Sequence, residues 1–174
     1  MESTSDLGVA YSLYTKIDLD KVQCLNESVD GSGKKVFKPW NERKNFDSYL
    51  ESDCDAELLL NIPFTGNVKL KGIIVLGGTD DSHPSRVHIY KNRPSMNFDD
   101  TTCEADQEIE LQKDPDGVVE YPTKIVKFTN VHHLTLFFPR NFGDDNTRIY
   151  YIGLKGDFTE VCCQRYLYCI PFDL

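Results

Sequence analysis

The sequence predicts an all-β fold, an antiparallel β-sandwich of the jelly-roll type. Short apolar or alternating runs recur along the chain, separated by turn signals such as Thr65-Gly66-Asn67 and Asp114-Pro115-Asp116-Gly117. No window of about a dozen residues combines a sustained helical period with an N-cap and a terminating glycine, so long helices are not expected. Short strands with turns and long loops at their ends are typical of antiparallel sandwiches.

The length and composition fit one globular domain. The chain has 174 residues, of which 40% are hydrophobic and 27% are charged. A chain of this mass buries about 70% of its unfolded surface, so it can form a core without disulfides or metal. We expect one folded domain over residues 11–160, a flexible tail over 1–10 and an apolar segment over 161–174, which packs as a tail or adds an edge strand.

The first third of the domain is predicted as a short strand or turn that leads into a long irregular loop. Apolar residues line one side of the run YSLYTKIDLDKVQCLNES: Ile17, Leu19, Val22 and Leu25. Glycines and a proline punctuate the chain beyond it. Four aromatic residues are expected to fix this loop to the core, namely Phe37, Trp40, Phe46 and Tyr49.

β-Strands are predicted from residue 58 onward. The apolar run 58–64 ends at a turn signal, and the run 68–78 passes from alternation to a wholly apolar stretch. Further strands are predicted over 86–92, on both sides of the turn at 114–117, over 131–138 and over 147–156. Within 86–92, Val87 and Ile89 should face the core. The opposite face carries Arg86, His88 and Tyr90.

The charge pattern bears on the class of partner. The formal net charge is −9 at pH 7, and the lysines are scattered. Nucleic acid and anionic membrane both require a dense basic patch, so neither is expected as a partner. A protein with a basic patch is a better electrostatic match. No apolar run reaches the length of about 18 residues that a membrane span needs.

The N-terminus and the cysteines predict a reducing compartment. The start, MESTSDLG, is polar and acidic, and it lacks the basic and apolar regions of a secretory signal. We therefore expect the cytoplasm or nucleus, where thiols stay reduced. Six cysteines are then free thiols: Cys24, Cys54, Cys103, Cys162, Cys163 and Cys169.

The patterns of catalytic, metal and cofactor sites are incomplete. The stretch ESDCDAE at 51–57 lacks the glycine of a calcium loop, and Cys54 has no nearby ligand with which to share zinc. The chain contains no CxxC, GxSxG or HExxH motif, and GSGKK at 31–35 lacks the spacing of a phosphate loop. We predict no enzyme activity, metal or cofactor, and we interpret ESDCDAE as a polar turn before a strand.

One acid–base arrangement leaves an enzyme as an alternative. His83 lies in the loop TDDSHPS beside Asp80 and Asp81, and a carboxylate–histidine pair can transfer protons. No nucleophile motif accompanies it, so ordering of the loop through side-chain hydrogen bonds is favoured. The pairs His132-His133 and Cys162-Cys163 point to opposite faces of a strand and cannot share an ion or form a bridge.

Several segments together resemble one known family. They include QCLNES at 23–28, LESDCDAELLLNIPFTGNVKLKGI at 50–73, YKNRPSMNFDD at 90–100 and IYYIGLKGDFTE at 149–160. This combination resembles the PITH domain, a module named for proteasome-interacting thioredoxin. The resemblance covers roughly residues 11–160 and is closest to the stand-alone members, in which no thioredoxin domain precedes the module.

The resemblance implies a jelly roll similar to the galactose-binding-like and discoidin-like folds. It also implies association with the 26S proteasome, at its regulatory particle, in cytoplasm and nucleus. We expect a monomer when the protein is free. The alternative is a lectin-like module that binds a sugar through its end loops, with an aromatic ring such as that of Trp40 stacked on the sugar.

The predicted contact surface consists of polar residues around the ends of the strands. Leu50, Leu58, Leu60 and Ile62 are expected in the core. The partner-binding candidates are Glu51, Asp53, Asp55, Glu57, Asp80, Asp81 and His83. They belong to the loops 24–57 and 77–85, and the loop 139–147 is the third expected contact surface.

Overall fold

The protein is represented by a computed structural model that describes residues 12–159. The predicted tail over 1–10 and the apolar segment over 161–174 lie outside the described residues. The strands are β1 (Gln23–Leu25), β2 (Leu50–Glu51), β3 (Leu58–Gly77), β4 (Arg86–Lys91), β5 (Gln107–Glu110), β6 (Tyr121–Pro122), β7 (Val131–Phe138) and β8 (Arg148–Thr159). Short 3-10 helices complete the described part: η1 (Tyr14–Lys16), η2 (Leu19–Lys21), η3 (Ser32–Val36), η4 (Trp40–Glu42) and η5 (Asp99–Thr102).

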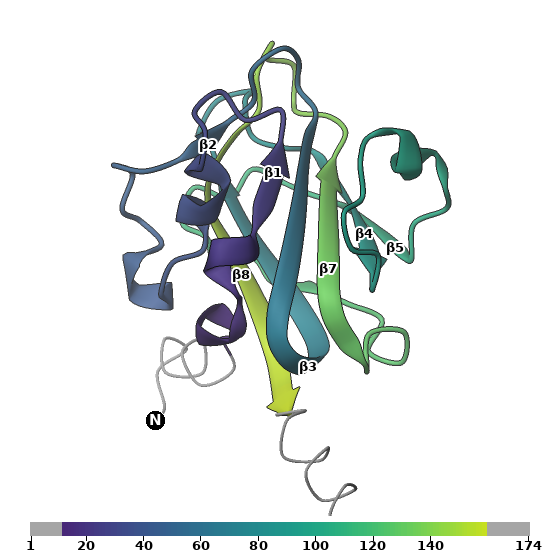
Figure 1. Ribbon diagram of the computed structural model, residues 1–174. Coiled ribbons are helices and arrows are strands. Elements are labelled where there is room, and N and C mark those ends of the chain that lie inside the picture. The colour runs from purple at the N-terminus through teal and green to yellow at the C-terminus, as the bar shows by residue number, and fades with distance from the viewer. Residues whose placement is uncertain (1–11, 160–174) are drawn as a thin grey trace, which may run out of the picture.

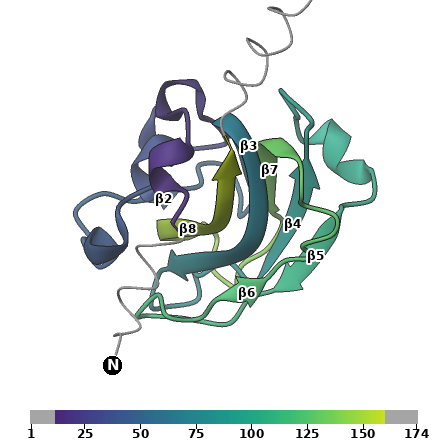
Figure 2. The same ribbon diagram turned by 90° about the horizontal axis from the view of Figure 1, so that it is seen from below.

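One long strand, β3, belongs to both layers of a sandwich. Its first half pairs with β7 from Leu58 to Pro63, and its second half pairs with β8 from Asn67 to Gly77. Figures 1 and 2 show β3 curving around at the lower end of the molecule, so that its two halves lie in different layers. The two layers are therefore joined through a continuous strand.

The turn signal at Thr65-Gly66-Asn67 marks this bend, but β3 does not end there. The prediction of two separate strands, 58–64 and 68–78, is corrected to one strand with a register shift between Pro63 and Val68. A Cβ atom at Gly66 would lie 2.7 Å from the carbonyl oxygen of Thr159. Glycine lets β8 approach the bend closely, and this approach keeps the strand paired.

The two antiparallel layers confirm the predicted fold class. One layer runs β1–β3–β7–β4–β5, and the other runs β2–β8–β3–β6. The main core lies between them. The four predicted core residues, Leu50, Leu58, Leu60 and Ile62, expose none of their surface and belong to this core. The first segment forms η1, η2 and β1, in agreement with the predicted short strand or turn.

The face of β4 that the sequence predicts to be exposed is partly covered by another segment of the chain. Val87 and Ile89 face the core as expected, but Tyr90, on the opposite face, is also fully buried. The loop after β4 covers it, because Tyr90 packs with Leu59 and Met96 in a second apolar cluster. The Tyr90 hydroxyl donates a hydrogen bond to the carbonyl oxygen of Thr101 at 3.2 Å.

The turn at Asp114–Gly117 forms as predicted. The buried Asp114 carboxylate accepts hydrogen bonds from the N–H groups of Gly117 at 3.0 Å and Val119 at 2.8 Å. Gly117 has a φ of +66°, which a glycine adopts without strain. The strand expected after this turn is reduced to β6, because the chain leaves the sheet after Pro122 and forms another turn.

Candidate functional site

The three predicted contact loops meet at one end of the sandwich. The N–H of Ser52 donates to the carbonyl oxygen of Thr147 at 2.9 Å, and the N–H of Thr147 donates back to the Ser52 hydroxyl at 2.8 Å. The N–H of Phe142 donates to the carbonyl oxygen of Asp81 at 3.0 Å, which joins the loop 139–147 to the loop 77–85. This end lies at the top of Figure 1.

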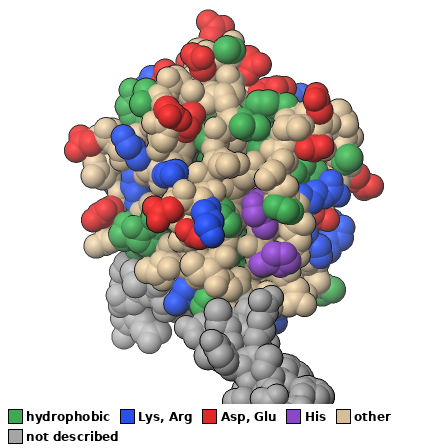
Figure 3. Space-filling view, viewed as in Figure 1, with side chains coloured by type: hydrophobic (Ala, Val, Ile, Leu, Met, Phe, Trp, Pro, Cys, Tyr) green, Lys and Arg blue, Asp and Glu red, His purple; other side chains and the backbone are tan. Residues whose placement is uncertain are grey.

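Exposed carboxylates collect on this end, which we call the acidic end. Figure 3 shows acidic side chains gathered at the top of the molecule. Its exposed acids are Asp53, Asp55, Asp80, Asp81, Asp144 and Asp145. Lys113 pairs with Asp81 at 2.7 Å, while the other five make no ion pair within residues 12–159. The acidic end therefore presents a negative potential to a partner.

The stretch ESDCDAE forms the rim of this end. Ser52 is buried, and the Asp55 carboxylate accepts the N–H of Glu57 at 2.9 Å, so the interpretation as a polar turn before a strand is confirmed. Burial, with a further contribution from Asp55, raises the pKa of the Glu57 carboxyl. The rim is held from below by Asn26, whose side chain donates to the Asp55 carboxylate and to the carbonyl oxygen of Glu57, each at 2.8 Å.

Arg148 connects the two groups of predicted acids, and sequence reasoning missed it. Its Nε donates to the Glu51 carboxylate at 2.7 Å, and its Nη2 bonds to the same oxygen. The backbone N–H of Arg148 donates to the carbonyl oxygen of Ser82 at 2.9 Å. The hydrogen bonds that the guanidinium donates to Glu51 raise the pKa of Arg148 further. Because Glu51 and Arg148 are 97 positions apart, only the β2–β8 pairing brings them together.

An aromatic cluster of Phe46, Tyr49 and Tyr150 adjoins the acidic end. The ring centroids of Phe46 and Tyr150 are 4.9 Å apart, and those of Tyr49 and Tyr150 are 5.7 Å apart, both in edge-to-face geometry. The Arg148 guanidinium lies 4.9 Å from the centre of the Tyr49 ring. Phe46 remains 49% exposed and Tyr49 41% exposed. These residues were predicted to anchor their loop, and they do so while leaving apolar surface in contact with solvent.

The buried ammonium of Lys38 orders the loop that carries this cluster. It donates to the carbonyl oxygens of Asn45 at 2.7 Å and Ser48 at 3.0 Å. Burial lowers the pKa of Lys38, and nearby carboxylates partly offset that effect. Within the same loop, Lys44 pairs with Asp116 at 2.9 Å. The exposed rings are thus presented in a fixed arrangement.

The structure separates His83 from the carboxylates that could make it an acid–base catalyst. His83 is fully buried, and its Nδ1 donates to the carbonyl oxygen of Pro84 at 2.7 Å. Asp80 instead accepts from Ser82, and Asp81 pairs with Lys113. Burial lowers the pKa of His83. Its neighbours Asp80 and Asp81 supply the exposed surface of this loop, and the His83 side chain lies beneath it.

Trp40 belongs to the loop 24–57 but does not offer a free ring. Its ring contacts the Arg43 guanidinium at 4.0 Å and the Lys155 ammonium at 5.3 Å from the ring centre. A small hollow of about 230 Å³ adjoins it, lined by Ser12, Tyr14, Thr15, Pro39, Trp40 and Asn41. The predicted stacking of a sugar on Trp40 would have to displace one of these cations or use the edge of the ring.

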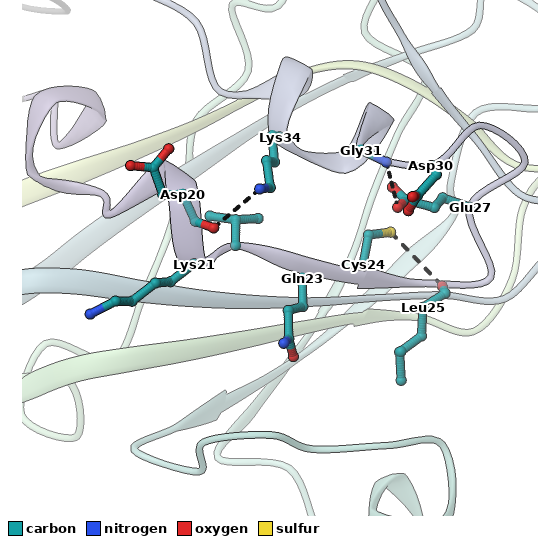
Figure 4. Close-up of a pocket in the computed structure, with 10 residues that line it drawn as sticks. Asp20, Lys21, Gln23, Cys24, Leu25, Glu27, Asp30, Gly31 and Lys34 are labelled. Atoms are coloured by element: carbon teal, nitrogen blue, oxygen red, sulfur yellow. Dashed lines mark hydrogen bonds between the residues drawn. The ribbon is translucent and has the colours of Figure 1, made fainter.

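A second hollow, of about 540 Å³, lies beside β1 and between η2 and η3. Figure 4 shows that the Lys34 ammonium reaches the carbonyl oxygen of Asp20 across it, at 3.1 Å. The Glu27 carboxylate accepts the N–H groups of Gly31 and Gly33, each at 2.8 Å. Burial raises the pKa of the Cys24 thiol, which disfavours the nucleophilic thiolate. The polar side chains here form hydrogen bonds with backbone groups of the loop and do not form an acid–base pair with one another.

Within residues 12–159, no three His, Cys, Asp or Glu side chains are grouped so that they could hold a metal ion. The helices in the same range are all too short and too polar to traverse a bilayer.

Comparison with solved structures supports the fold. The third family 32 carbohydrate-binding module of a Clostridium perfringens family 31 glycoside hydrolase aligns with a TM-score of 0.59 and 13% identity, over 87% of this chain and 98% of that one. A family 32 module of C. perfringens NanJ, solved with galactose, aligns with a TM-score of 0.57 and 8% identity, over 83% and 97% of the two chains. At these identities the likeness shows the galactose-binding-like jelly roll alone.

Comparison with sequences supports the family. The model of the PITH domain matches residues 3–164. The PITH domain-containing protein CG6153 of Drosophila melanogaster is 62% identical over 155 residues, which cover 89% of this chain and 74% of that protein. The human PITH domain-containing protein 1 is 56% identical over 160 residues, covering 92% and 76%. The chain therefore belongs to the PITH domain family.

Proposed function

We propose that this protein is a non-enzymatic interaction module that associates with the regulatory particle of the 26S proteasome. Membership of the PITH domain family supports the choice of partner, because the family resemblance implies that association. Cytoplasm and nucleus are the corresponding locations. The observation that carries an interaction role is the acidic end with the ordered, half-exposed aromatic cluster beside it.

The physical argument rests on the composition of this surface. Tyrosine, phenylalanine and arginine are enriched in the centres of protein interfaces, and aromatic anchors there carry much of the binding energy. Phe46, Tyr49 and Arg148 supply these residue types in one place. The exposed carboxylates of the acidic end favour a basic partner and accelerate the encounter at low ionic strength. Lys38 orders the loop in advance, which reduces the entropy lost on binding.

Binding of tagged protein to purified 26S proteasome tests the proposal. The wild type should bind, with weaker binding at higher ionic strength. The double variant Phe46→Ala/Tyr49→Ala should weaken binding about tenfold or more, because it removes both exposed anchors. Asp53→Lys/Asp55→Lys should mainly slow association. The matched control is Asp99→Lys/Glu104→Lys, which reverses two exposed acids between β4 and β5, outside the three contact loops.

Two results would contradict the proposal. One is the absence of binding to proteasomes at low ionic strength. The other is equal weakening by the control and by the acidic-end variant, which would show an effect of net charge alone. Crosslinking mass spectrometry on the bound complex should place the crosslinks on the loops 24–57, 77–85 and 139–147.

Sugar binding is the second candidate, and the likeness to carbohydrate-binding modules favours it. The hollow beside Tyr14 and Trp40 combines two aromatic residues with hydroxyl and amide groups, which suits a small sugar. A thermal shift with galactose in the wild type, lost in Tyr14→Ala, would support this function. The absence of any shift at high galactose concentration would remove it.

A further inference from the structure

The end of the sandwich opposite the acidic end carries an exposed aliphatic turn. β7 begins just after this turn and ends at the loop 139–147, so the turn and the acidic end lie at opposite ends of β7 (Figure 1). The turn has the sequence KIVKF, residues 124–128, and we call it the aliphatic tip. Val126 is 90% exposed and Ile125 is 41% exposed. Val126 is thus almost as accessible as in an extended chain.

The exposure of these side chains is built into the fold. Phe128, at the end of the tip, is fully buried, and its carbonyl oxygen accepts the N–H of Leu70 at 2.9 Å. On the other side the Thr123 hydroxyl donates to the carbonyl oxygen of Leu70 at 2.7 Å. The N–H of Lys127 closes the turn on the carbonyl oxygen of Lys124 at 2.9 Å. Both ends are fixed to β3, so the two aliphatic residues are held toward solvent.

Lysines surround the tip, and their charges are poorly neutralised. Lys69, Lys91, Lys124 and Lys127 form no ion pair with a carboxylate within residues 12–159. The Lys91 ammonium bonds to the backbone carbonyl oxygen of Lys127, which holds this cation against the tip. Two acids lie nearby: Asp157 is paired with Lys71 at 2.9 Å, and the Asp106 carboxylate accepts the backbone N–H of Lys91 at 2.8 Å. The lysines at this end therefore outnumber these two carboxylates. This end is locally positive although the whole chain is negative.

A polar hollow of about 460 Å³ adjoins the tip. It is lined by Asn67, Val68, Lys69, Thr129, Asn130, Asp157 and Thr159. Thr129 and Asn130 directly follow the tip in sequence, and Lys69 comes from the strand to which the tip is bonded. Amide, hydroxyl and ammonium groups in one hollow can donate hydrogen bonds to a phosphate or carboxylate.

We propose that this end docks on a bilayer that contains anionic phospholipid. Ile125 and Val126 enter the interfacial region, the lysines contact lipid phosphates, and the hollow receives a headgroup. The residue types favour lipid over protein. Protein interfaces are depleted in lysine and use aromatic and arginine anchors, whereas a projecting aliphatic pair ringed by lysines needs no complementary cavity in a bilayer.

The different charge at the two ends of the molecule reconciles this proposal with the net negative charge of the protein. The acidic end lies at the far end of β7 from the tip, and charges separated by more than about 8 Å are largely screened at physiological salt. The expectation against anionic membranes rests on the net charge and on lysines that are scattered along the sequence, whereas the fold brings several of these lysines to one end. The separation of charge instead orients the acidic end away from an anionic surface.

Vesicle sedimentation with the full chain under reducing conditions tests the proposal. Vesicles of phosphatidylcholine alone are compared with vesicles containing about a third phosphatidylserine. The wild type should bind the second kind more strongly, and salt should weaken the binding. Val126→Asp should weaken it about tenfold, because a charge replaces the inserted side chain. The matched control is Val29→Asp, at a valine that is 60% exposed in a different loop.

A second variant separates the charge from the insertion. Lys124→Gln/Lys127→Gln should lower binding to phosphatidylserine vesicles and reduce its salt dependence. In Val126→Trp, the fluorescence should shift to the blue when phosphatidylserine vesicles are added. Two outcomes would overturn the proposal: equal vesicle binding by Val126→Asp and Val29→Asp, or no vesicle binding by the wild type at low salt. A protein would then be the better candidate partner for the tip. Proteasome binding by the tip variants should stay unchanged, which keeps this test independent of the proposed function.

Discussion

At the scale of single residues, Arg148 has the most connections at the acidic end. It bonds to Glu51, lies over the ring of Tyr49 and fixes the backbone at Ser82. Its role could not be read from the sequence, because each of its partners lies in another loop. In contrast, the core positions Leu50 and Leu58 and the polar rim between them could be predicted from the sequence, since apolar and polar side chains separate there within a few neighbouring residues.

Removing Arg148 should destabilise the protein. We expect Arg148→Ala to lower the free energy of unfolding by about 1–2 kcal/mol, because it breaks a charge-assisted pair that is partly screened by solvent. Urea unfolding measures the loss. Arg148→Lys keeps the charge without the planar guanidinium and should recover only part of the stability. Wild-type stability in Arg148→Ala would show that the pair contributes nothing.

Buried histidines predict a loss of stability at mildly acidic pH. Burial lowers the pKa of His83, His88 and His133 below the ordinary value of 6.5. Below pH 6.5 the unfolded chain therefore binds more protons than the folded protein. Stability should be fully present above that pH and should fall as the pH drops below it, by up to about 1.4 kcal/mol per pH unit for each histidine.

Unfolding in urea at a series of pH values between neutrality and moderate acidity measures this slope. In His83→Gln the slope should be shallower than in the wild type by up to one proton. The exposed His132→Gln controls for the loss of a histidine as such. A slope that does not change in His83→Gln would mean that this imidazole is protonated in the folded state.

At the scale of elements, β3 is where the sequence pattern and the structure differ most. The turn residues Thr65-Gly66-Asn67 have the composition of a loop, and local rules therefore predict that the strand ends. The pairing of β8 across the bend keeps the strand continuous. Tyr90 illustrates the same limit, since alternation assigns it to a polar face and a distant loop covers it. Contacts between segments far apart in sequence decide both cases.

Alanine at Gly66 should weaken the bend of β3. The added Cβ would lie 2.7 Å from the carbonyl oxygen of Thr159 and 2.8 Å from the Phe158 ring. We expect a loss of about 1–3 kcal/mol in the free energy of unfolding, typical of overpacking. Thr65→Ala, at the exposed neighbouring position, should change it by less than about 0.5 kcal/mol. Equal effects of the two substitutions would contradict the close approach.

At the scale of the whole molecule, the net charge says little about how charge is distributed over the surface. The sequence supplies the total of −9, while the fold collects several of the acids at one end and several lysines at the other. The predicted contact loops do converge, and this could be anticipated because end loops of a sandwich cluster. The aromatic cluster could not be recognised as a surface, since its members come from the loop after η4 and from β8.

The free protein should be monomeric, because its sheet edge is charged. β5 pairs only with β4 within the described residues, and its exposed positions are Glu108 and Glu110. Charged side chains on an edge strand oppose pairing with another copy. Glu108→Val/Glu110→Val should promote association, measured by sedimentation velocity. Glu104→Val, just outside β5, is the control, and a wild type that is already dimeric would contradict the prediction.

The shared strand β3 also has a consequence for how the molecule opens. In a sandwich of two independent sheets, one layer can separate from the other while keeping its own hydrogen bonds. Here neither layer can detach without breaking the same backbone segment from both β7 and β8. Local unfolding is therefore confined to the peripheral loops. The amide protons of both layers should exchange with solvent only through global unfolding of the domain.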